Sequence, residues 1–328
     1  MSEFSIGIAG LGRWGRNYLA TLSRLPGCQV RAVADPVLSS RRGELGCQGV
    51  EGLRCYFSTA EMLKDNGLDG VVIATPETTH FPLAELALSR GKHVLVEKPM
   101  ALTVTEARQL LRHAGNAGLV LAVGHTALYL PGFSRLWAAV RSGRLGRLQR
   151  MLAVRTSAGP GSAGRNPAVR GPLWDLAAHD IAMAVALLGT PVAGRCRAGD
   201  SGTVGQAATA SAYELAFAGG VVLRGRCRWQ AGPARRAFIA IGTRGRCRCT
   251  ETRIEPFEQR PLTRQCADFI GACRNHTTPF SSAALGLIVT ASLAALSAAA
   301  ATPGQWRTID EPCHSDRVVR CSAIGIPT

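Results

Sequence analysis

The sequence has little lysine: only three of its 38 lysine and arginine side chains, Lys64, Lys92 and Lys98, are lysine. Acidic side chains are also few, at 22, and the formal net charge is +16. So high a share of arginine, together with abundant alanine and glycine, indicates a bias in codon composition. The charge is uneven, because residues 1–125 hold 13 basic and 11 acidic side chains and residues 126–328 hold 25 and 11. A basic second half favours phosphorylated substrates, an acidic partner or nucleic acid.

Three further absences narrow the class of protein. The 11 cysteines include no Cys-x-x-Cys pair and their number is odd, so we expect reduced, structural cysteines and no metal site. No aromatic-rich RNA motif or recognition-helix pattern appears, so we expect no nucleic-acid partner. Nothing at the N-terminus resembles a signal peptide, and the longest apolar run, 283–301, is mostly alanine with two serines. We therefore expect a cytoplasmic protein with no membrane partner, in which this run is a buried helix.

The first 35 residues predict a dinucleotide-binding βαβ unit. An apolar strand runs into Gly10-x-Gly12-x-x-Gly15, a helix follows to Leu25, and a second apolar strand ends at Asp35. Phosphates would bind at the N-terminus of the helix, where unpaired N–H groups and the helix dipole favour an anion. A second Gly-x-Gly-x-x-Gly string at 159–164 contains a proline and lacks a strand before it and a helix after it, so we interpret it as a loop.

Asp35 bears on the choice of cofactor. A carboxylate at the tip of the second strand is placed to accept hydrogen bonds from the adenosine ribose, which favours NAD. Arg41 and Arg42 lie just downstream and leave NADP possible, because arginine side chains can accommodate a 2′-phosphate.

The pattern of strands and helices predicts two domains. Strands alternate with helices as far as Gly124, which predicts a Rossmann domain with a doubly wound parallel sheet over residues 1–124. From His125 onward the pattern changes to a helix at 132–142, a strand at 148–156 and a helix at 173–188. Several strands then follow with little helix between them, at 192–197, 207–217, 221–230 and 234–241. We therefore predict an α+β domain over 125–328, built on a mostly antiparallel, open-faced sheet and closed by helices near 265–274 and 283–300.

Four motifs occur in a fixed order along the chain. The glycine string is followed by Ala74-Thr75-Pro76 with His80 shortly after it, by Glu97-Lys98-Pro99, and by Trp174-Asp175-Leu176-Ala177-Ala178-His179. Together they resemble the family of glucose–fructose oxidoreductase, inositol dehydrogenase and related NAD(P)-dependent sugar oxidoreductases. The resemblance covers most of the chain, to about Arg307.

The resemblance implies a set of cofactor contacts and a role for one lysine. The implied contacts are Gly10, Gly12, Arg13, Trp14, Gly15, Asp35, Thr75, Pro76, His80, Glu97 and Lys98. In such enzymes the lysine of Glu-Lys-Pro lies beside the nicotinamide, and the proline after it usually has a cis bond. Lys98 would then donate to the reacting hydroxyl and stabilise the oxygen as it gains alkoxide character. For Lys98 alone, the alternative is a solvated lysine at the end of a strand.

Asp175 and His179 are the candidate acid–base pair. Residues four apart share one face of a helix, so the two side chains would lie one turn apart. The resemblance makes His179 the general base, and imidazole suits that role because its unperturbed pKa is near neutrality. Asp175 would orient the substrate or the imidazole. The alternative for His179 is a buried histidine of the core.

The resemblance also suggests residues that contact the substrate, namely His125, Tyr129, Arg155, Arg165 and Trp174. The closest branch of the family oxidises nucleotide-linked or phosphorylated sugars, and loop arginines could bind a diphosphate. Interdomain packing is the alternative for His125 and Tyr129, and a solvated surface is the alternative for each arginine. In this family one face of the second sheet forms the oligomer interface, so we expect a homodimer or homotetramer. The strings Arg224-x-Arg226-x-Arg228 and Arg244-x-Arg246-x-Arg248 would each place three guanidinium groups on one strand face.

The sequence therefore predicts an NAD(P)-dependent oxidoreductase that interconverts a secondary alcohol and a ketone on a nucleotide-linked or phosphorylated sugar. The reaction would be of the 3-dehydrogenase or 3-ketoreductase type. Two alternatives stay open: an inositol or cyclitol dehydrogenase, and a noncatalytic nucleotide-binding partner subunit on the same fold.

Overall fold

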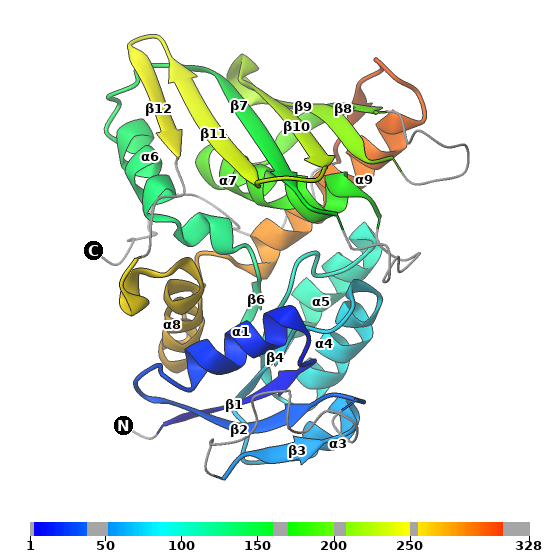
Figure 1. Cartoon of the computed structure of the whole chain (residues 1–328), viewed down its shortest axis with the longest axis vertical. Coiled ribbons are helices and arrows are strands. Elements are labelled where there is room, and N and C mark those ends of the chain that lie inside the picture. Colours follow the sequence, from blue (N-terminus) through cyan, green and yellow to red (C-terminus); the bar gives the residue numbers. More distant parts are fainter. Residues whose placement is uncertain (1–2, 38–51, 160–169, 200–207, 250–254, 311–328) are drawn as a thin grey trace. The chain divides into compact units, whose positions relative to one another are not determined.

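The chain divides into two compact units (Figure 1). The computed structural model describes residues 3–37, 52–159, 170–199, 208–249 and 255–310. The first unit comprises residues 1–124 and 256–286, and the second comprises 125–255 and 287–328. The structure thus has the expected boundary after Gly124 but differs at 256–286, which the sequence placed in the second domain. The cause is α8 (Pro261–Asn275), which packs against α1 (Arg13–Leu22) and adds Cys266, Phe269 and Cys273 to the first core.

A six-stranded parallel sheet forms the centre of the first unit, in the order β3-β2-β1-β4-β5-β6. The strands are β1 (Phe4–Ala9), β2 (Cys28–Ala34), β3 (Arg54–Tyr56), β4 (Gly70–Ile73), β5 (His93–Val96) and β6 (Leu121–Val123). Strands β1 and β4 are buried along their whole length, as expected for parallel strands whose two faces are both covered. The predicted Rossmann topology is confirmed.

Helices cover both faces of this sheet (Figure 1). Helices α1 and α8 pack together on one face, and α4 (His80–Ser89) and α5 (Val104–Asn116) pack together on the other. The short α3 (Thr59–Met62) begins with a cap at Ser58, whose hydroxyl accepts a hydrogen bond from the Ala60 N–H. The 3₁₀ turn η1 (Glu77–Thr79) precedes α4 directly.

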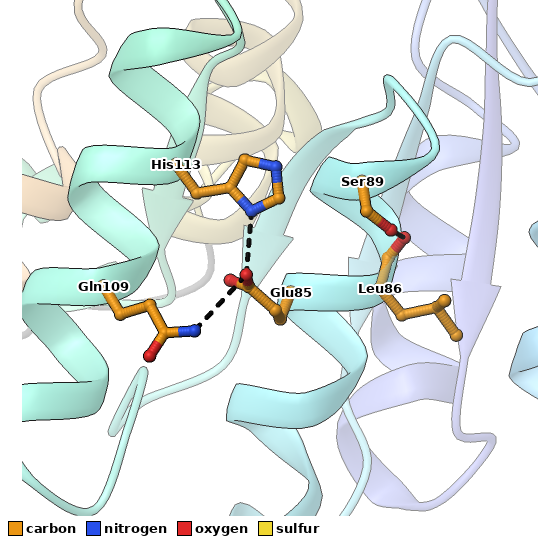
Figure 2. A network of polar contacts seen from close by, with 5 residues as sticks. All are labelled: Glu85, Leu86, Ser89, Gln109 and His113. Atoms are coloured by element: carbon orange, nitrogen blue, oxygen red, sulfur yellow. Dashed lines mark hydrogen bonds and ion pairs between the residues drawn. The ribbon is translucent and has the colours of Figure 1, made fainter.

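A polar network holds α4 to α5 (Figure 2). The Glu85 Oε1 atom lies 2.9 Å from His113 Nδ1 and accepts a hydrogen bond of 3.4 Å from Gln109 Nε2. Within α4, the Ser89 hydroxyl donates to the Leu86 carbonyl at 2.8 Å. The side chains of Glu85 and His113 are about a third exposed, at 30% and 28%, so this network links the two helices near the surface.

A seven-stranded sheet forms the second unit, in the order β12-β11-β7-β10-β9-β8-β13. The strands are β7 (Leu148–Ser157), β8 (Pro191–Ala198), β9 (Ala210–Phe217), β10 (Val222–Trp229), β11 (Arg235–Gly242), β12 (Gly245–Cys249) and β13 (Arg307–Thr308). Only β7 and β10 pair in parallel, so the predicted mostly antiparallel sheet is confirmed. The edge strand β13 was not predicted, because it is only two residues long, whereas β12 contains Arg246 and Arg248 of a string that was predicted to lie on one strand face.

Helices lie against one face of the second sheet (Figure 1). They are α6 (Pro131–Arg141), α7 (Ala178–Leu188) and α9 (Ala283–Ala300), whose first residues belong to the first unit. Among the described residues, α9 is the one helix that is long and apolar enough to cross a membrane, but 72% of its apolar window is buried. That burial fits the prediction of a core helix.

The other face of the second sheet is open and basic. Arg224, Arg226 and Arg228 are exposed on one face of β10, as predicted. On β12 the same holds for Arg246 and Arg248, whereas Arg244 lies in the preceding turn. Glu214 lies on β9, between β8 and β10. Its carboxylate forms ion pairs with Arg195 at 2.7 Å and with Arg224 at 3.1 Å.

Seven of the described cysteines, Cys28, Cys55, Cys196, Cys227, Cys247, Cys266 and Cys273, are free thiols. Burial raises the pKa of the Cys28 thiol to about 12 and that of Cys196 to about 11. Thiols so protonated are unreactive, which fits the expected structural role. No group of three or more metal-binding side chains lies close together within the described residues.

Candidate active site

The glycine loop between β1 and α1 has the geometry of a phosphate cradle. Gly10 has a positive φ of 85° and donates its N–H to the Ala34 carbonyl at 2.8 Å, and a Cβ on Gly15 would overlap the Gly10 carbonyl. A Cβ on Gly12 would meet no described atom within 4 Å. Helix α1 begins directly after Gly12 with no side-chain cap and no acidic residue in its first turn. The loop therefore offers open space and helix N–H groups to an anion, which fits a dinucleotide.

Asp35 lies just after β2 and fixes this loop. Its Oδ2 accepts a hydrogen bond from the Leu11 N–H at 2.6 Å, and its Oδ1 accepts one from the Val37 N–H at 3.0 Å. Arg13 and Trp14, both predicted to contact the cofactor, are exposed at the start of α1. Arg41 and Arg42 lie outside the described residues.

His80 joins the turns that follow β4 and β5. Its ring is 2% exposed, with Nδ1 2.7 Å from the Pro99 carbonyl oxygen and Nε2 2.9 Å from the Thr75 carbonyl oxygen. Burial lowers the pKa of His80, helped by the nearby Lys98 charge, although the two carbonyls act in the opposite direction. Because both ring nitrogens face protein carbonyls, His80 links the two turns, and its contact with the cofactor stays a prediction.

Glu97, Lys98 and Pro99 form the turn after β5, and the Lys98–Pro99 peptide bond is cis, as the resemblance implied. Lys98 is partly exposed between buried neighbours. The Glu97 side chain points inward instead: its Oε1 accepts from the Tyr18 hydroxyl at 2.8 Å, and its Oε2 accepts from the Lys98 N–H at 3.2 Å. Burial raises the pKa of this carboxyl, while Tyr18 and Lys98 partly offset that effect. Glu97 thus supports the turn from its buried side, and its contact with the cofactor stays a prediction.

Asp175 and His179 stand out on the buried helical segment of the second unit. Residues 171–186 are buried except for these two, which are partly exposed. The segment begins as a π-helical turn, η4 (Leu173–Ala177), and continues as α7. Sequence reasoning expected a regular α-helix here, and a π turn inside a helix often marks a functional site. The one-turn spacing of the predicted pair therefore leads to two accessible polar side chains on an otherwise apolar element.

His125 lies beside His179. The two ring centroids are 6.3 Å apart and nearly perpendicular, at 84°. His125 is 1% exposed and precedes η2 (Thr126–Tyr129), a 3₁₀ turn that packs against α7. Tyr129 ends this turn and is 6% exposed. The structure thus places His125 against the predicted base, whereas the substrate contacts proposed for His125 and Tyr129 stay predictions.

The remaining predicted substrate residues have other contacts. Arg155 on β7 is 6% exposed, and its guanidinium binds the Asp180 carboxylate with distances of 2.8, 3.2 and 3.3 Å. The guanidinium is thus held by a carboxylate of the same unit, and the substrate contact of Arg155 stays a prediction. Trp174 is 2% exposed and donates its indole N–H to the Ser297 hydroxyl at 2.8 Å. Arg165 and the loop string at 160–164 lie outside the described residues.

Two further contacts lie near Asp175, and sequence reasoning missed the first of them. The Trp229 indole Nε1 donates to Asp175 Oδ2 at 3.1 Å, and the Arg170 guanidinium lies 4.9 Å from the centroid of the Trp174 ring. Along β10 the arginines alternate with uncharged residues, and this sequence pattern could have placed Trp229 on the covered face of the sheet. No local signal pairs it with Asp175, which lies 54 residues away.

Family models match both parts of the chain. Residues 4–125 match an oxidoreductase family with an NAD-binding Rossmann fold, and residues 133–248 match the GFO/IDH/MocA C-terminal domain. The rhizopine catabolism protein MocA of Rhizobium meliloti is 28% identical over 180 residues, which are 55% of this chain and 56% of that protein. The UDP-N-acetylglucosamine 3-dehydrogenase of Acidithiobacillus ferrooxidans is 34% identical over 132 residues, which are 40% of this chain and 39% of that protein. The chain thus spans about half or less of these relatives' length.

Solved structures share the fold over nearly the whole chain. GenD2 from gentamicin A biosynthesis, crystallised in complex with NAD, has a TM-score of 0.84 and 22% sequence identity. The match covers 94% of this chain and 97% of that one. Inositol dehydrogenases also occur among the matched sequences and structures.

Proposed function

Because the chain belongs to the GFO/IDH/MocA family of NAD-binding oxidoreductases, we propose that it interconverts a secondary alcohol and a ketone on a nucleotide-linked or phosphorylated sugar. The observation that carries this proposal is the pair of accessible residues, Asp175 and His179, on a segment that is otherwise buried from 171 to 186. A binding module has no need for a general base on that element. The geometry of the glycine loop and Asp35 supports NAD as the cofactor.

The proposed chemistry divides among three side chains. His179 takes the hydroxyl proton in the oxidation and returns it in the reduction. Lys98 donates a hydrogen bond to the same oxygen, and the bond strengthens as negative charge develops there. Asp175 orients the imidazole or the substrate. When bound, NAD accepts the hydride that leaves the carbon.

The substrate class rests on charge and on one relative. Residues 126–328 carry 25 basic against 11 acidic side chains, which favours an anionic substrate. The guanidinium of the exposed Arg170 lies over the ring of Trp174. Trp174 directly precedes Asp175 in the sequence. A relative that is named UDP-N-acetylglucosamine 3-dehydrogenase supports a reaction of the 3-dehydrogenase or 3-ketoreductase type. The matched inositol dehydrogenases keep a cyclitol as the second candidate.

We also propose a cytoplasmic homodimer or homotetramer that assembles through the open face of the second sheet. Val154 on that face is 42% exposed, and Ile239 and Leu152 lie side by side in register on β11 and β7. Two arginines on this face, Arg195 and Arg224, form ion pairs with Glu214 of the same chain. Sedimentation of the wild type and of Val154→Glu would test it, with the monomer expected for the variant.

A substrate panel tests the activity. UDP- and dTDP-sugars, sugar phosphates and inositols would each be supplied with NAD, and the absorbance of the reduced nicotinamide would be followed. We expect turnover with a nucleotide-linked or phosphorylated sugar. Turnover with inositols alone would establish the cyclitol alternative. NAD binding without turnover of any compound would favour a noncatalytic subunit.

A further inference from the structure

The buried imidazole of His80, the first residue of α4, faces two carbonyl oxygens. Its Nδ1 lies 2.7 Å from the Pro99 oxygen, and its Nε2 lies 2.9 Å from the Thr75 oxygen. A carbonyl oxygen can only accept, so each contact needs an N–H on the ring, whereas a neutral imidazole carries one N–H. Because burial lowers the pKa of His80, the ring is neutral at neutral pH. Only one of the two contacts is then a hydrogen bond.

The Pro99 carbonyl is the acceptor that depends on this ring. The Thr75 turn has supports of its own, because the Thr79 hydroxyl lies 2.7 Å from both the Thr75 hydroxyl and the Pro76 carbonyl oxygen. The Thr79 N–H also donates to the Pro76 carbonyl, at 2.9 Å. Within the described residues, by contrast, no backbone N–H donates to the Pro99 carbonyl. The contact to Pro99 is also the shorter one, so we place the ring proton on Nδ1.

The residue directly before Pro99 is Lys98. Residues 94–101 are buried except for Lys98, so this lysine is the accessible side chain of the turn. Its own N–H donates to Glu97 Oε2 at 3.2 Å, which holds the backbone on the N-terminal side of the lysine. From the contact on the other side we propose that His80 is a positioning residue, whose Nδ1–H holds the Pro99 carbonyl and thereby fixes the turn that carries Lys98.

This inference rests on the proposed role of Lys98, so its first two tests need no turnover. The histidine rings of the full chain would be labelled with ¹⁵N, and the His80 signals would be assigned by their loss in His80→Asn. We expect Nδ1 of His80 to carry a proton in the wild type at neutral pH, and Nε2 to carry none. A proton on Nε2 and none on Nδ1 would overturn the inference.

The second test uses the scarcity of lysine. The chain has three lysines, so labelling with ¹³C at the ε carbon gives three signals, and that of Lys98 is assigned by its loss in Lys98→Met. Asparagine places its amide N–H where histidine has Nδ1, and glutamine places it where histidine has Nε2. We expect the Lys98 signal to move in His80→Gln and to stay near its wild-type position in His80→Asn. The signals of Lys64 and Lys92 are internal controls and should stay in place. A Lys98 signal that responds alike to both variants, or to neither, would overturn the inference.

The third test measures kcat with the best substrate of the panel. His80→Gln loses the donor to Pro99, and a small displacement of a group that contacts the reacting atoms predicts a fall in kcat of roughly 10- to 100-fold. His80→Asn keeps that donor and should keep most of the wild-type kcat. Equal losses would mean that the ring acts by packing or by touching the cofactor, and would overturn the inference. His113→Asn and His113→Gln, at a partly exposed histidine of the α4–α5 network, are the matched controls.

A double-mutant cycle identifies the route of the effect. If His80 acts through Lys98, then His80→Gln should cause no further loss of kcat in the Lys98→Met background. An equal loss in both backgrounds would overturn the inference. If the wild type turns over no compound while the Lys98 signal responds to His80→Gln alone, the proposed function fails and the positioning of Lys98 by His80 stands.

Discussion

Tyr18 and Glu97, which lie 79 residues apart in the sequence, share a buried hydrogen bond of 2.8 Å. Tyr18 belongs to α1, the helix that follows the glycine loop, and Glu97 belongs to the turn that carries Lys98. The bond therefore couples the proposed phosphate cradle to the lysine that is proposed to contact the substrate. The side chains of Tyr18 and Glu97 are both buried. Burial raises the pKa of the Glu97 carboxyl group that accepts this hydrogen bond.

The first prediction concerns the pH dependence of stability. Burial raises the pKa of Glu97 in the folded protein, so the folded state keeps its proton to a higher pH than the unfolded state does. The free energy of unfolding should therefore fall as pH rises from the unfolded pKa, about 4.3, to the higher folded pKa. Glu97→Gln has no carboxyl group at this position, so the decrease in unfolding free energy that comes from Glu97 should be absent in this variant. Urea denaturation between pH 4 and 8 measures it, and Glu61→Gln at an exposed position is the control. Parallel curves for the wild type and Glu97→Gln would contradict the assignment.

The second prediction concerns Gly124, which lies beside the same carboxylate. A Cβ at this position would come within 2.9 Å of the carboxyl carbon and both oxygens of Glu97. Gly124→Ala should therefore destabilise the protein by about 1–3 kcal/mol through overpacking. In a Glu97→Ala background the space is free, so the same substitution should cost much less. A double-mutant cycle of denaturation midpoints measures this, and equal costs in the two backgrounds would show that the clash is not the cause.

The parts of the fold and of the candidate site that could be predicted from the sequence are those that depend on local patterns. The glycine loop, the strand ending at Asp35 and the pair Asp175 and His179 are visible in sequence because each depends on spacing within one or two elements. The partners of these residues are set by tertiary packing: Tyr18 with Glu97, Arg155 with Asp180, and Trp229 with Asp175. The π turn before α7 was also missed, because side-chain periodicity over five residues does not distinguish a π turn from an α turn.

The third prediction concerns the cofactor. Asp35 would repel a 2′-phosphate, so the wild type should bind NAD more tightly than NADP. In Asp35→Ser this preference should shrink, and the affinity for NAD should also fall because the Leu11 N–H loses its carboxylate partner. Fluorescence titration with both reduced cofactors measures the ratio. A wild type that prefers NADPH would refute the argument from Asp35.

The fourth prediction concerns the proposed base. His179→Asn keeps a polar side chain but removes the imidazole that is proposed to take the hydroxyl proton, so kcat should fall by about 10²–10⁴-fold. Affinity for NAD should be unchanged, because the glycine loop and Asp35 lie in the other unit. His113→Asn, in the α4–α5 network of Figure 2, is the control and should keep the wild-type kcat. Equal loss of cofactor binding in His179→Asn would mean that the residue is structural.

The last prediction concerns Lys98, which separates the enzyme from the noncatalytic subunit most directly. The ammonium group is proposed to bind the substrate oxygen more strongly as that oxygen becomes alkoxide-like, so the interaction favours the transition state over the ground state. Lys98→Met keeps the length and apolar volume of the side chain and removes the donors. The cis bond that follows and the Glu97 contact to the Lys98 N–H involve the backbone, so the turn should keep its shape.

The variant should therefore fold and bind NAD, and it should lose mainly kcat, by about 3–4 kcal/mol if Lys98 acts like one oxyanion donor. Lys64→Met, at an exposed lysine outside the site, is the matched control. Steady-state kinetics with the best sugar, together with a separate NAD titration, distinguish the two effects. Unchanged turnover in Lys98→Met would refute the assignment, because a donor that stabilises the developing charge cannot be removed without slowing the chemical step.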